Sequence, residues 1–158
     1  MTKETFMRKA IQLACETVDH GNTPFGAVIV KDGKIISGEA NEVASGNDPT
    51  AHAELLAIRT AGKQLGTENL AGYELFASGE PCPMCLGAIY AAGIENVYVA
   101  YSLEEAVEYG LASPYVYEQV AKPNDKRDIS FIPLKPSLVE EHPYDVWKRQ
   151  VKSDEKQS

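Results

Sequence analysis

The spacing of apolar residues predicts that the chain alternates helices and strands. Residues 3–19 place apolar side chains at every third or fourth position, which is typical of an amphipathic helix, and residues 20–21 end it. Residues 26–30 and 35–40 are two short apolar runs joined by an Asp-Gly turn. They predict a β-hairpin directly after the first helix.

The middle of the chain predicts a helix followed by a strand–helix–strand unit. Residues 52–65 carry a helical apolar pattern that Gly66 stops. A strand is expected over residues 73–77 and a helix over residues 83–92. Residues 96–101 form a nearly continuous apolar run, which is typical of a strand buried on both faces.

This alternation predicts an α/β protein, because two strands joined through a helix pair in parallel. We expect a three-layer α/β/α fold with a central mixed sheet of about five strands, the fifth over residues 130–134 at an edge because Pro133 cannot donate a ladder hydrogen bond. Ligands bind such sheets where strand ends meet helix N-termini.

The last third of the chain is less regular. Short helices are expected over residues 103–109 and 115–121, and a final helix over residues 142–152. The sequence shows no internal repeat and no linker. We therefore predict a single domain over residues 1–151 and a frayed tail over residues 152–158.

Composition narrows the class of partner and the compartment. Fifteen basic and 23 acidic residues give a net charge of −8, which disfavours binding to nucleic acid or to an anionic membrane. The first residues carry several charges and no stretch is long and apolar enough to span a bilayer. Three cysteines fit a reducing cytoplasm, and Cys15 is expected to be a packed thiol.

Cys82 and Cys85 have the spacing of half a metal site. If Pro81 opens a helix, the two sulfur atoms lie on one face and can hold a single ion. The helix N-terminus lowers the pKa of a thiol and favours the thiolate that a metal requires.

His52 is the expected third ligand, and Glu54 the expected proton carrier. A Cys2His set leaves the fourth zinc position open for water, as in catalytic sites. Zinc lowers the pKa of that water to about 7, so a nearby carboxylate such as Glu54 can take its proton and later return it. Both side chains can reach one ion only at a helix start, for which Thr50 is the expected N-cap.

Each half of this pattern has a plainer explanation. A lone histidine is often a core residue, and a lone CxxC can be a redox pair or a chance match. The combination of HxE with PCxxC after a gap of 26 residues is far more specific.

His52-Ala53-Glu54 with Pro81-Cys82-Pro83-Met84-Cys85 resembles the zinc-dependent cytidine deaminase superfamily, whose base deaminases carry HxE and PCxxC. Residues 23–28, Asn41, residues 47–50 and residues 85–90 resemble its bacterial guanine deaminase branch. Members of that branch are small cytoplasmic enzymes, often domain-swapped dimers in which the C-terminal segment helps to close the partner's active site.

The resemblance implies a role for each matching residue. Zinc is held by His52, Cys82 and Cys85, one ion per chain, and Glu54 shuttles protons. Asn41 and the backbone of Ala53 bind polar atoms of the ring, and Phe25 packs on the base. A core position for Phe25 and a turn or cap role for Asn41 are the alternatives.

Two positions depart from the branch. Its members carry an acidic second proton shuttle in the loop where this chain has Gly110-Leu111-Ala112-Ser113-Pro114-Tyr115, and they end on an aromatic lid residue where this chain ends in Lys156-Gln157-Ser158. Glu105 or Glu108 are candidates for the missing acid, although solvated surface charges are the simpler interpretation. The candidates for covering the pocket are aromatic: Tyr115, Tyr144 and Trp147.

The predicted function is therefore hydrolytic deamination of a free nucleobase, with guanine converted to xanthine and ammonia. Deamination of cytosine, a pterin or a triazine is the nearest alternative. Editing of tRNA adenosine is disfavoured by the acidic charge, and a non-catalytic zinc scaffold would need neither an open ligand position nor Glu54. A homodimer is expected by the resemblance only.

Overall fold

The computed structural model describes residues 1–138 and 140–157 and separates into two compact units, residues 1–122 and 123–158. Unit 1 contains ten elements, which are α1 (Lys3–Val18), β1 (Gly26–Lys31), β2 (Lys34–Ala40), α2 (Val43–Gly46), α3 (Ala53–Leu65), β3 (Glu74–Gly79), α4 (Pro83–Ala92), β4 (Asn96–Tyr101), α5 (Leu103–Glu108) and α6 (Tyr115–Ala121). Every predicted helix and strand of this unit is present, with ends that differ by no more than two residues, and α2 is an additional short helix.

The sheet of unit 1 is mixed and has the strand order β2-β1-β3-β4. Strand β1 pairs antiparallel with β2 and with β3, whereas β3 and β4 pair in parallel, as the strand–helix–strand pattern predicts. Four strands are present in place of the expected five. Residues 130–134 belong to no strand, since they lie in the other unit and Pro133 removes a donor.

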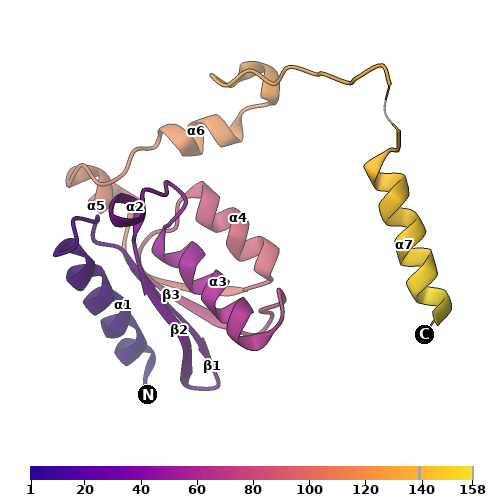
Figure 1. Ribbon diagram of the computed structural model, residues 1–158. Helices are drawn as coiled ribbons and strands as arrows, with labels where there is room; N and C mark the ends of the chain where they lie inside the picture. The colour runs from indigo at the N-terminus through magenta and orange to yellow at the C-terminus, as the bar shows by residue number, and fades with distance from the viewer. Residues whose placement is uncertain (139, 158) are drawn as a thin grey trace. The chain divides into compact units, whose positions relative to one another are not determined.

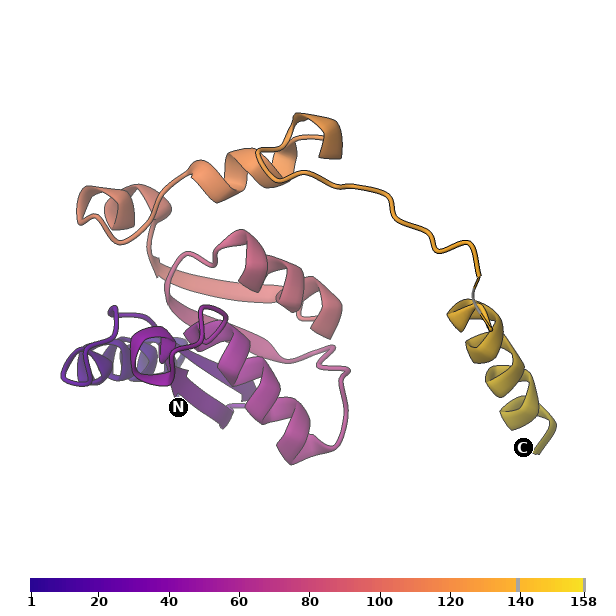
Figure 2. The ribbon, with the colours of Figure 1, turned by 45° about the horizontal axis from the view of Figure 1, so that its top comes forward.

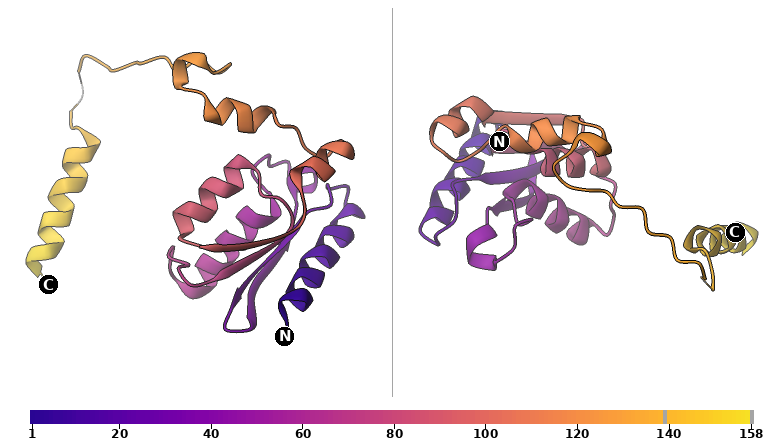
Figure 3. Two further views of the ribbon diagram at one scale, coloured as in Figure 1. Left: turned by 180° about the vertical axis from the view of Figure 1, so that it is seen from behind. Right: turned by 90° about the horizontal axis from the view of Figure 1, so that it is seen from above.

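Side chains of β1 alternate between two cores, which gives the predicted three layers. Val28 and Val30 face α1, where they pack with Phe6 and Phe76. Ala27 and Ile29 face the opposite side and pack in a core with residues of α3 and α4, which include Ala53, Ala57, Ala61, Ile89 and Ala92. Figure 1 and the rear view in Figure 3 show α1 on one face of the sheet and α3 and α4 on the other.

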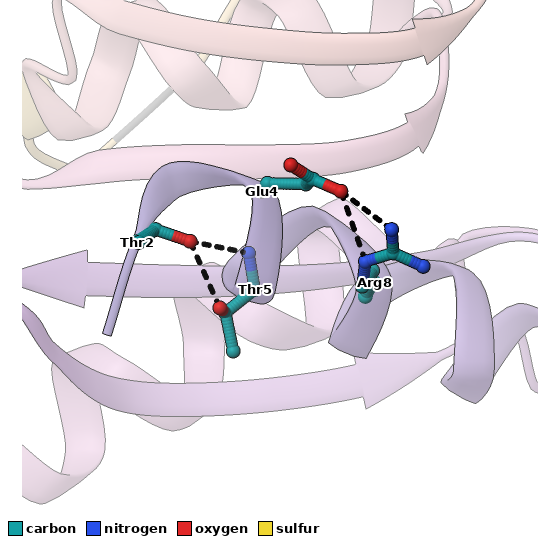
Figure 4. A network of polar contacts seen from close by, with 4 residues as sticks. All are labelled: Thr2, Glu4, Thr5 and Arg8. Atoms are coloured by element: carbon teal, nitrogen blue, oxygen red, sulfur yellow. Dashed lines mark hydrogen bonds and ion pairs between the residues drawn. The ribbon is translucent and has the colours of Figure 1, made fainter.

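Helix α1 is stabilised by contacts within its first turns and by its close approach to β1. At its start the Thr2 hydroxyl accepts a hydrogen bond from the Thr5 amide, and Glu4 pairs with Arg8 one turn later (Figure 4). Farther along, a Cβ at Gly26 would lie 2.1 Å from the Ala10 carbonyl oxygen, so only glycine lets α1 approach β1 this closely.

Two burial predictions are wrong. Strand β4 is an outer strand with Val99 41% and Tyr101 51% exposed, because only β3 pairs with it. Cys15 was expected to be packed but is exposed on α1, since its neighbours Ala14 and Ala10 occupy the face toward the sheet.

The strand ends and helix starts that form the site lie at one edge of the sheet. Strands β2, β3 and β4 run in the same direction, so their carboxyl ends lie together, beside the start of β1. The chain leaves β3 directly into α4, and the loop after β2 leads to α3 (Figure 2). Both helix N-termini therefore face this edge.

Unit 2 contains the short 3-10 helix η1 (Asn124–Lys126) and α7 (Pro143–Gln157). Helix α7 continues five residues beyond the predicted end at residue 152. Within the part of the chain that the structure describes, none of the helices combines the length and apolar character needed to cross a bilayer.

Candidate metal centre and its cavity

His52, Cys82 and Cys85 converge at the sheet edge, as predicted. The Nδ1 atom of His52 lies 3.4 Å from the Cys82 sulfur and 3.6 Å from the Cys85 sulfur. The three candidate ligand atoms all lie within 4.8 Å of one another. No other group of at least three histidine, cysteine or acidic side chains in the described residues meets this condition.

The start of α3 explains how His52 and Glu54 reach the same place. His52 is the N-cap with extended backbone, and Glu54 lies in the first turn, so the mid-helix separation of the two side chains does not apply. The expected N-cap Thr50 is wrong. Asp48 accepts hydrogen bonds from the Thr50 amide and hydroxyl, and this Asx turn delays the helix until residue 53.

Helix α4 spans residues 83–92, as predicted, and Pro81 does not open it. Cys82 is the N-cap and Pro83 the first helical residue, a position where the missing amide hydrogen of proline costs nothing. Cys85 follows in the first turn and is fully buried, whereas Cys82 is half-buried. The predicted geometry of two sulfur atoms at a helix N-terminus is therefore present, with Pro81 outside the helix.

The two thiols differ in their electrostatics. A hydrogen bond with Cys85, aided by one with His52, lowers the pKa of Cys82 to about 4. The hydrogen bond with Cys82, together with burial, raises the pKa of Cys85. The hydrogen bond with Cys82 raises the pKa of His52. The Cys82 thiolate is therefore favoured over the Cys85 thiolate, and a cation bound by both sulfur atoms would displace the remaining proton.

The donor set fits zinc. Zinc–sulfur bonds of about 2.3 Å and zinc–nitrogen bonds of about 2.1 Å at tetrahedral angles require ligand atoms about 3.6 Å apart. The sulfur-to-nitrogen distances of 3.4 and 3.6 Å match this separation. Two thiolates and one imidazole are also the ligand types of catalytic zinc sites.

Glu54 lies beside these ligands and is 5% exposed. The Cys85 thiol donates a hydrogen bond to its Oε2 atom over 3.5 Å. Burial raises the pKa of Glu54, and the hydrogen bond from Cys85 and the charge of His52 oppose this shift only in part. The protonated form of this carboxyl group is therefore favoured more than it is in water.

A cavity of about 480 Å³, called the site cavity below, opens beside these residues. His52, Glu54 and Cys82 line it, as do the predicted Phe25 and Asn41. Ala53 does not line it and is fully buried. The rest of the wall is mostly apolar and comes from the segment before β1 and from the segments after β2, β3 and β4. These residues are Thr23, Val43, Pro49, Glu80, Pro83, Met84, Leu103, Ala106, Leu111, Ala112, Ser113, Val116 and Tyr117.

Asn41 combines the two roles weighed for it. Its Nδ2 atom donates to the Thr23 hydroxyl over 2.6 Å, and its Oδ1 atom accepts from the Val43 amide over 2.8 Å. These bonds make it a turn residue that joins the two loops at the mouth of the cavity. The remaining amide hydrogen and oxygen lone pair leave capacity for one further polar partner.

Tyr117 is one of the cavity residues that the sequence did not single out. Its hydroxyl donates to the Pro81 carbonyl oxygen, and burial raises its pKa to about 12. The expected Tyr115 does not line the cavity. A signal was available in the helical spacing of Ser113, Val116 and Tyr117, which share one face of α6 and its entry.

The residues proposed to replace the missing acid or to cover the pocket lie outside the wall of the site cavity. Glu105 forms a capping box with Ser102, and neither Glu105 nor Glu108 lines the site cavity. Tyr144 and Trp147 lie in unit 2 with exposed side chains. Ser113 lines the cavity from the loop in question, and its hydroxyl accepts from the Tyr115 amide.

Comparison with known proteins gives the family. Residues 1–101 match the cytidine and deoxycytidylate deaminase zinc-binding region, so the chain belongs to this family. Guanine deaminase of Bacillus subtilis (strain 168) is 46% identical over 151 residues, which cover 94% of this chain and 95% of that protein. Its X-ray structure superposes with a TM-score of 0.86. The predicted family and fold class are confirmed.

The family also contains proteins named for another substrate. A tRNA-specific adenosine deaminase of Aquifex aeolicus (strain VF5) is 46% identical over 97 residues, covering 61% of this chain and 64% of that protein. The match to the guanine deaminase therefore extends through the C-terminal third of the chain, whereas the match to the tRNA deaminase covers less than two thirds of it.

Proposed function

We propose that this protein is a zinc-dependent hydrolase that deaminates a free nucleobase, converting guanine to xanthine and ammonia. The observation that carries the proposal is the position of Glu54, a buried carboxyl group beside three zinc-type ligands at the wall of a half-enclosed cavity. A scaffold that only needed a structural ion would gain nothing from an open coordination position or from a buried acid.

The residues divide the work as follows. Zinc held by His52, Cys82 and Cys85 would make a water molecule acidic enough to act as a nucleophile near neutral pH. Glu54 would take one proton from that water and give it to the ring nitrogen next to the reacting carbon while the water oxygen bonds to that carbon. It would then carry the second proton of the same oxygen to the amine, so that the carbon–nitrogen bond breaks and ammonia leaves. Its raised pKa suits both directions of transfer.

Phe25 and Asn41 hold the ring in this proposal. The Phe25 ring presents a flat apolar surface, and the free capacity of the Asn41 amide can both donate to and accept from the edge of a base. The Ala53 backbone amide, at the start of α3, is the remaining candidate for a ring oxygen.

Guanine is preferred because the relative matched over nearly the whole chain is named a guanine deaminase. The second candidate is another amino-heterocycle such as cytosine, a pterin or a triazine, and one observation favours it. Ser113 stands in the loop where an acid is expected, and the other carboxylate that lines the cavity, Glu80, already accepts a hydrogen bond from the Leu103 amide. A tRNA substrate is disfavoured by the net charge of −8.

The test is ammonia release by the zinc-loaded protein from guanine, cytosine, adenine, their nucleosides, pterins and triazines, with Glu54→Gln as the blank. Turnover of guanine supports the first candidate. Turnover of another ring with guanine inert supports the second. If the protein holds zinc but releases ammonia from none of these compounds, both candidate functions are contradicted. A non-catalytic zinc-stabilised scaffold is then the remaining function.

We also propose a cytoplasmic homodimer. Unit 2 exposes large apolar side chains that a segment of its size cannot bury alone, among them Ile132, Leu134, Leu138 and Trp147. The outer strand β4 likewise leaves Val99 and Tyr101 exposed. A second copy supplies a matching surface for such patches. Light scattering that gives a monomer mass of 17.2 kDa at micromolar concentration would contradict the dimer.

A further inference from the structure

The Phe25 side chain stands between two cavities. One is the site cavity, and the other, of about 380 Å³, is lined by Phe25 together with residues of α1, β3 and β4. Gly79 lines only the second, neighbouring cavity. Phe25, Ala106 and Leu111 line both cavities, so the Phe25 ring forms part of the wall between them, and its position sets the width of the site cavity on that side.

Gly79 lets the ring occupy this position. It is the last residue of β3 and is buried, two residues before the metal-centre segment that starts at Pro81. A Cβ atom at this position would lie 2.8 Å from Cε1 and 2.9 Å from Cδ1 of Phe25. Carbon atoms in contact stay about 3.5–4.0 Å apart, so even an alanine side chain would displace the ring.

The backbone around Phe25 limits where the ring can go. The Phe25 amide donates to the Thr23 carbonyl oxygen, and its own carbonyl oxygen accepts from the Asn41 amide, each over 2.9 Å. With the backbone held, the ring responds by rotating about its side-chain bonds. Because Gly79 approaches from the neighbouring cavity, a side chain there drives the ring toward the site cavity and narrows it.

We propose that Gly79 is a specificity-determining residue, which keeps the Phe25 ring back and leaves the site cavity wide enough for a flat two-ring base. The proposal rests on the proposed function for the identity of the ligand. The proposal does not depend on the reaction itself, because the contact between Gly79 and Phe25 affects how a base binds and not how it reacts.

The experiment is a double-mutant cycle of Gly79→Ala and Phe25→Leu in the zinc-loaded Glu54→Gln protein, with guanine binding measured by calorimetry. We expect Gly79→Ala to weaken binding about tenfold when Phe25 is present, which is an overpacking cost of ordinary size. In the Phe25→Leu background the same change should cost less than about twofold, because the clashing ring atoms are gone. Equal losses in the two backgrounds would overturn the inference.

A second readout does not need the substrate. In a crystal structure of Gly79→Ala the Phe25 ring should be displaced toward the site cavity, and an unmoved ring would overturn the inference. If guanine fails to bind the parent protein, the proposed substrate is wrong. The position of the Phe25 ring in the Gly79→Ala structure then tests the inference without the substrate. If Gly79→Ala does not fold, recovery of folding by Phe25→Leu supports the clash, and absence of recovery contradicts it.

Discussion

The Tyr117 hydroxyl donates a hydrogen bond to the Pro81 carbonyl oxygen, with 2.6 Å between the two oxygen atoms. Pro81 directly precedes the ligand Cys82, so this bond ties α6 to the segment that carries the metal centre. Burial of the phenol raises its pKa to about 12. The neutral hydroxyl is therefore the form that the folded protein favours.

Replacement of Tyr117 by phenylalanine should lower the free energy of unfolding by about 1 kcal/mol at pH 7, the usual cost of one lost hydrogen bond. The folded pKa is raised above the ordinary value of 10.0, so the stabilisation is fully present below pH 10 and is lost between pH 10 and about 12. The difference between the parent and Tyr117→Phe should shrink over that window. Urea unfolding at several pH values measures it, and Tyr109→Phe, at a residue 82% exposed, should follow the parent throughout.

Replacement of Glu54 by glutamine should remove turnover and keep the metal. Glutamine has nearly the same shape but cannot take up and release a proton near neutral pH, so kcat should fall by about three orders of magnitude, within the range of general acid–base catalysis. Zinc content should remain at the parent level, because Glu54 is not among the three clustered ligands. Full turnover by Glu54→Gln with zinc bound would disprove the proton-carrier role.

Replacement of Cys85 by serine should abolish zinc retention. The buried sulfur of Cys85 is one of three ligand atoms within 4.8 Å of one another, and a serine hydroxyl is a poor zinc donor at neutral pH. Metal analysis after gel filtration should find little zinc, and ammonia release should be lost with it. Cys15→Ser is the matched control, since that thiol is exposed and outside the ligand group, and it should keep parent zinc content and turnover.

Replacement of Gly26 by alanine should destabilise the protein by about 3 kcal/mol, at the upper end of overpacking costs. The new Cβ would lie 2.1 Å from the Ala10 carbonyl oxygen and 2.8 Å from the Ala14 amide nitrogen, and backbone atoms cannot yield as a flexible side chain can. Chemical denaturation measures the change. Gly87→Ala is the contrast, because no atom lies within 4 Å of its added Cβ and alanine favours a helix, so it should stabilise α4 by about 0.5–1 kcal/mol.

Local pattern predicted the elements well because each depends on neighbours in sequence. The helix over residues 83–92 and the Gly66 and Gly93 ends follow from apolar spacing and from the left-handed backbone that glycine accepts. The errors fall where local signals compete. Thr50 is a plausible N-cap, but the Asx turn of Asp48 moves the N-cap to His52.

Burial was harder to predict than secondary structure. The apolar run Asn96–Tyr101 is typical of a central strand, yet β4 lies at the edge of its sheet. The hydropathy of a strand shows that the strand can be buried. Whether it has a neighbouring strand on each side depends on how distant segments of the chain pair. The burial of Cys15 was predicted wrongly for the same reason, since contacts of Gly26 and Phe6 determine which face of α1 lies against the sheet.

The sequence by itself determined the ligand set of this protein and the chemistry that the set implies. Cys82 and Cys85 owe their common face to the pitch of a helix, and a Cys2His set can be counted without coordinates. Only the tertiary structure decided which residues surround that centre. The bond from Tyr117 to Pro81, the bond from Asn41 to Thr23 and the approach of Gly79 to Phe25 join residues that are 18 to 54 positions apart. Such contacts arise from the packing of the whole sheet edge.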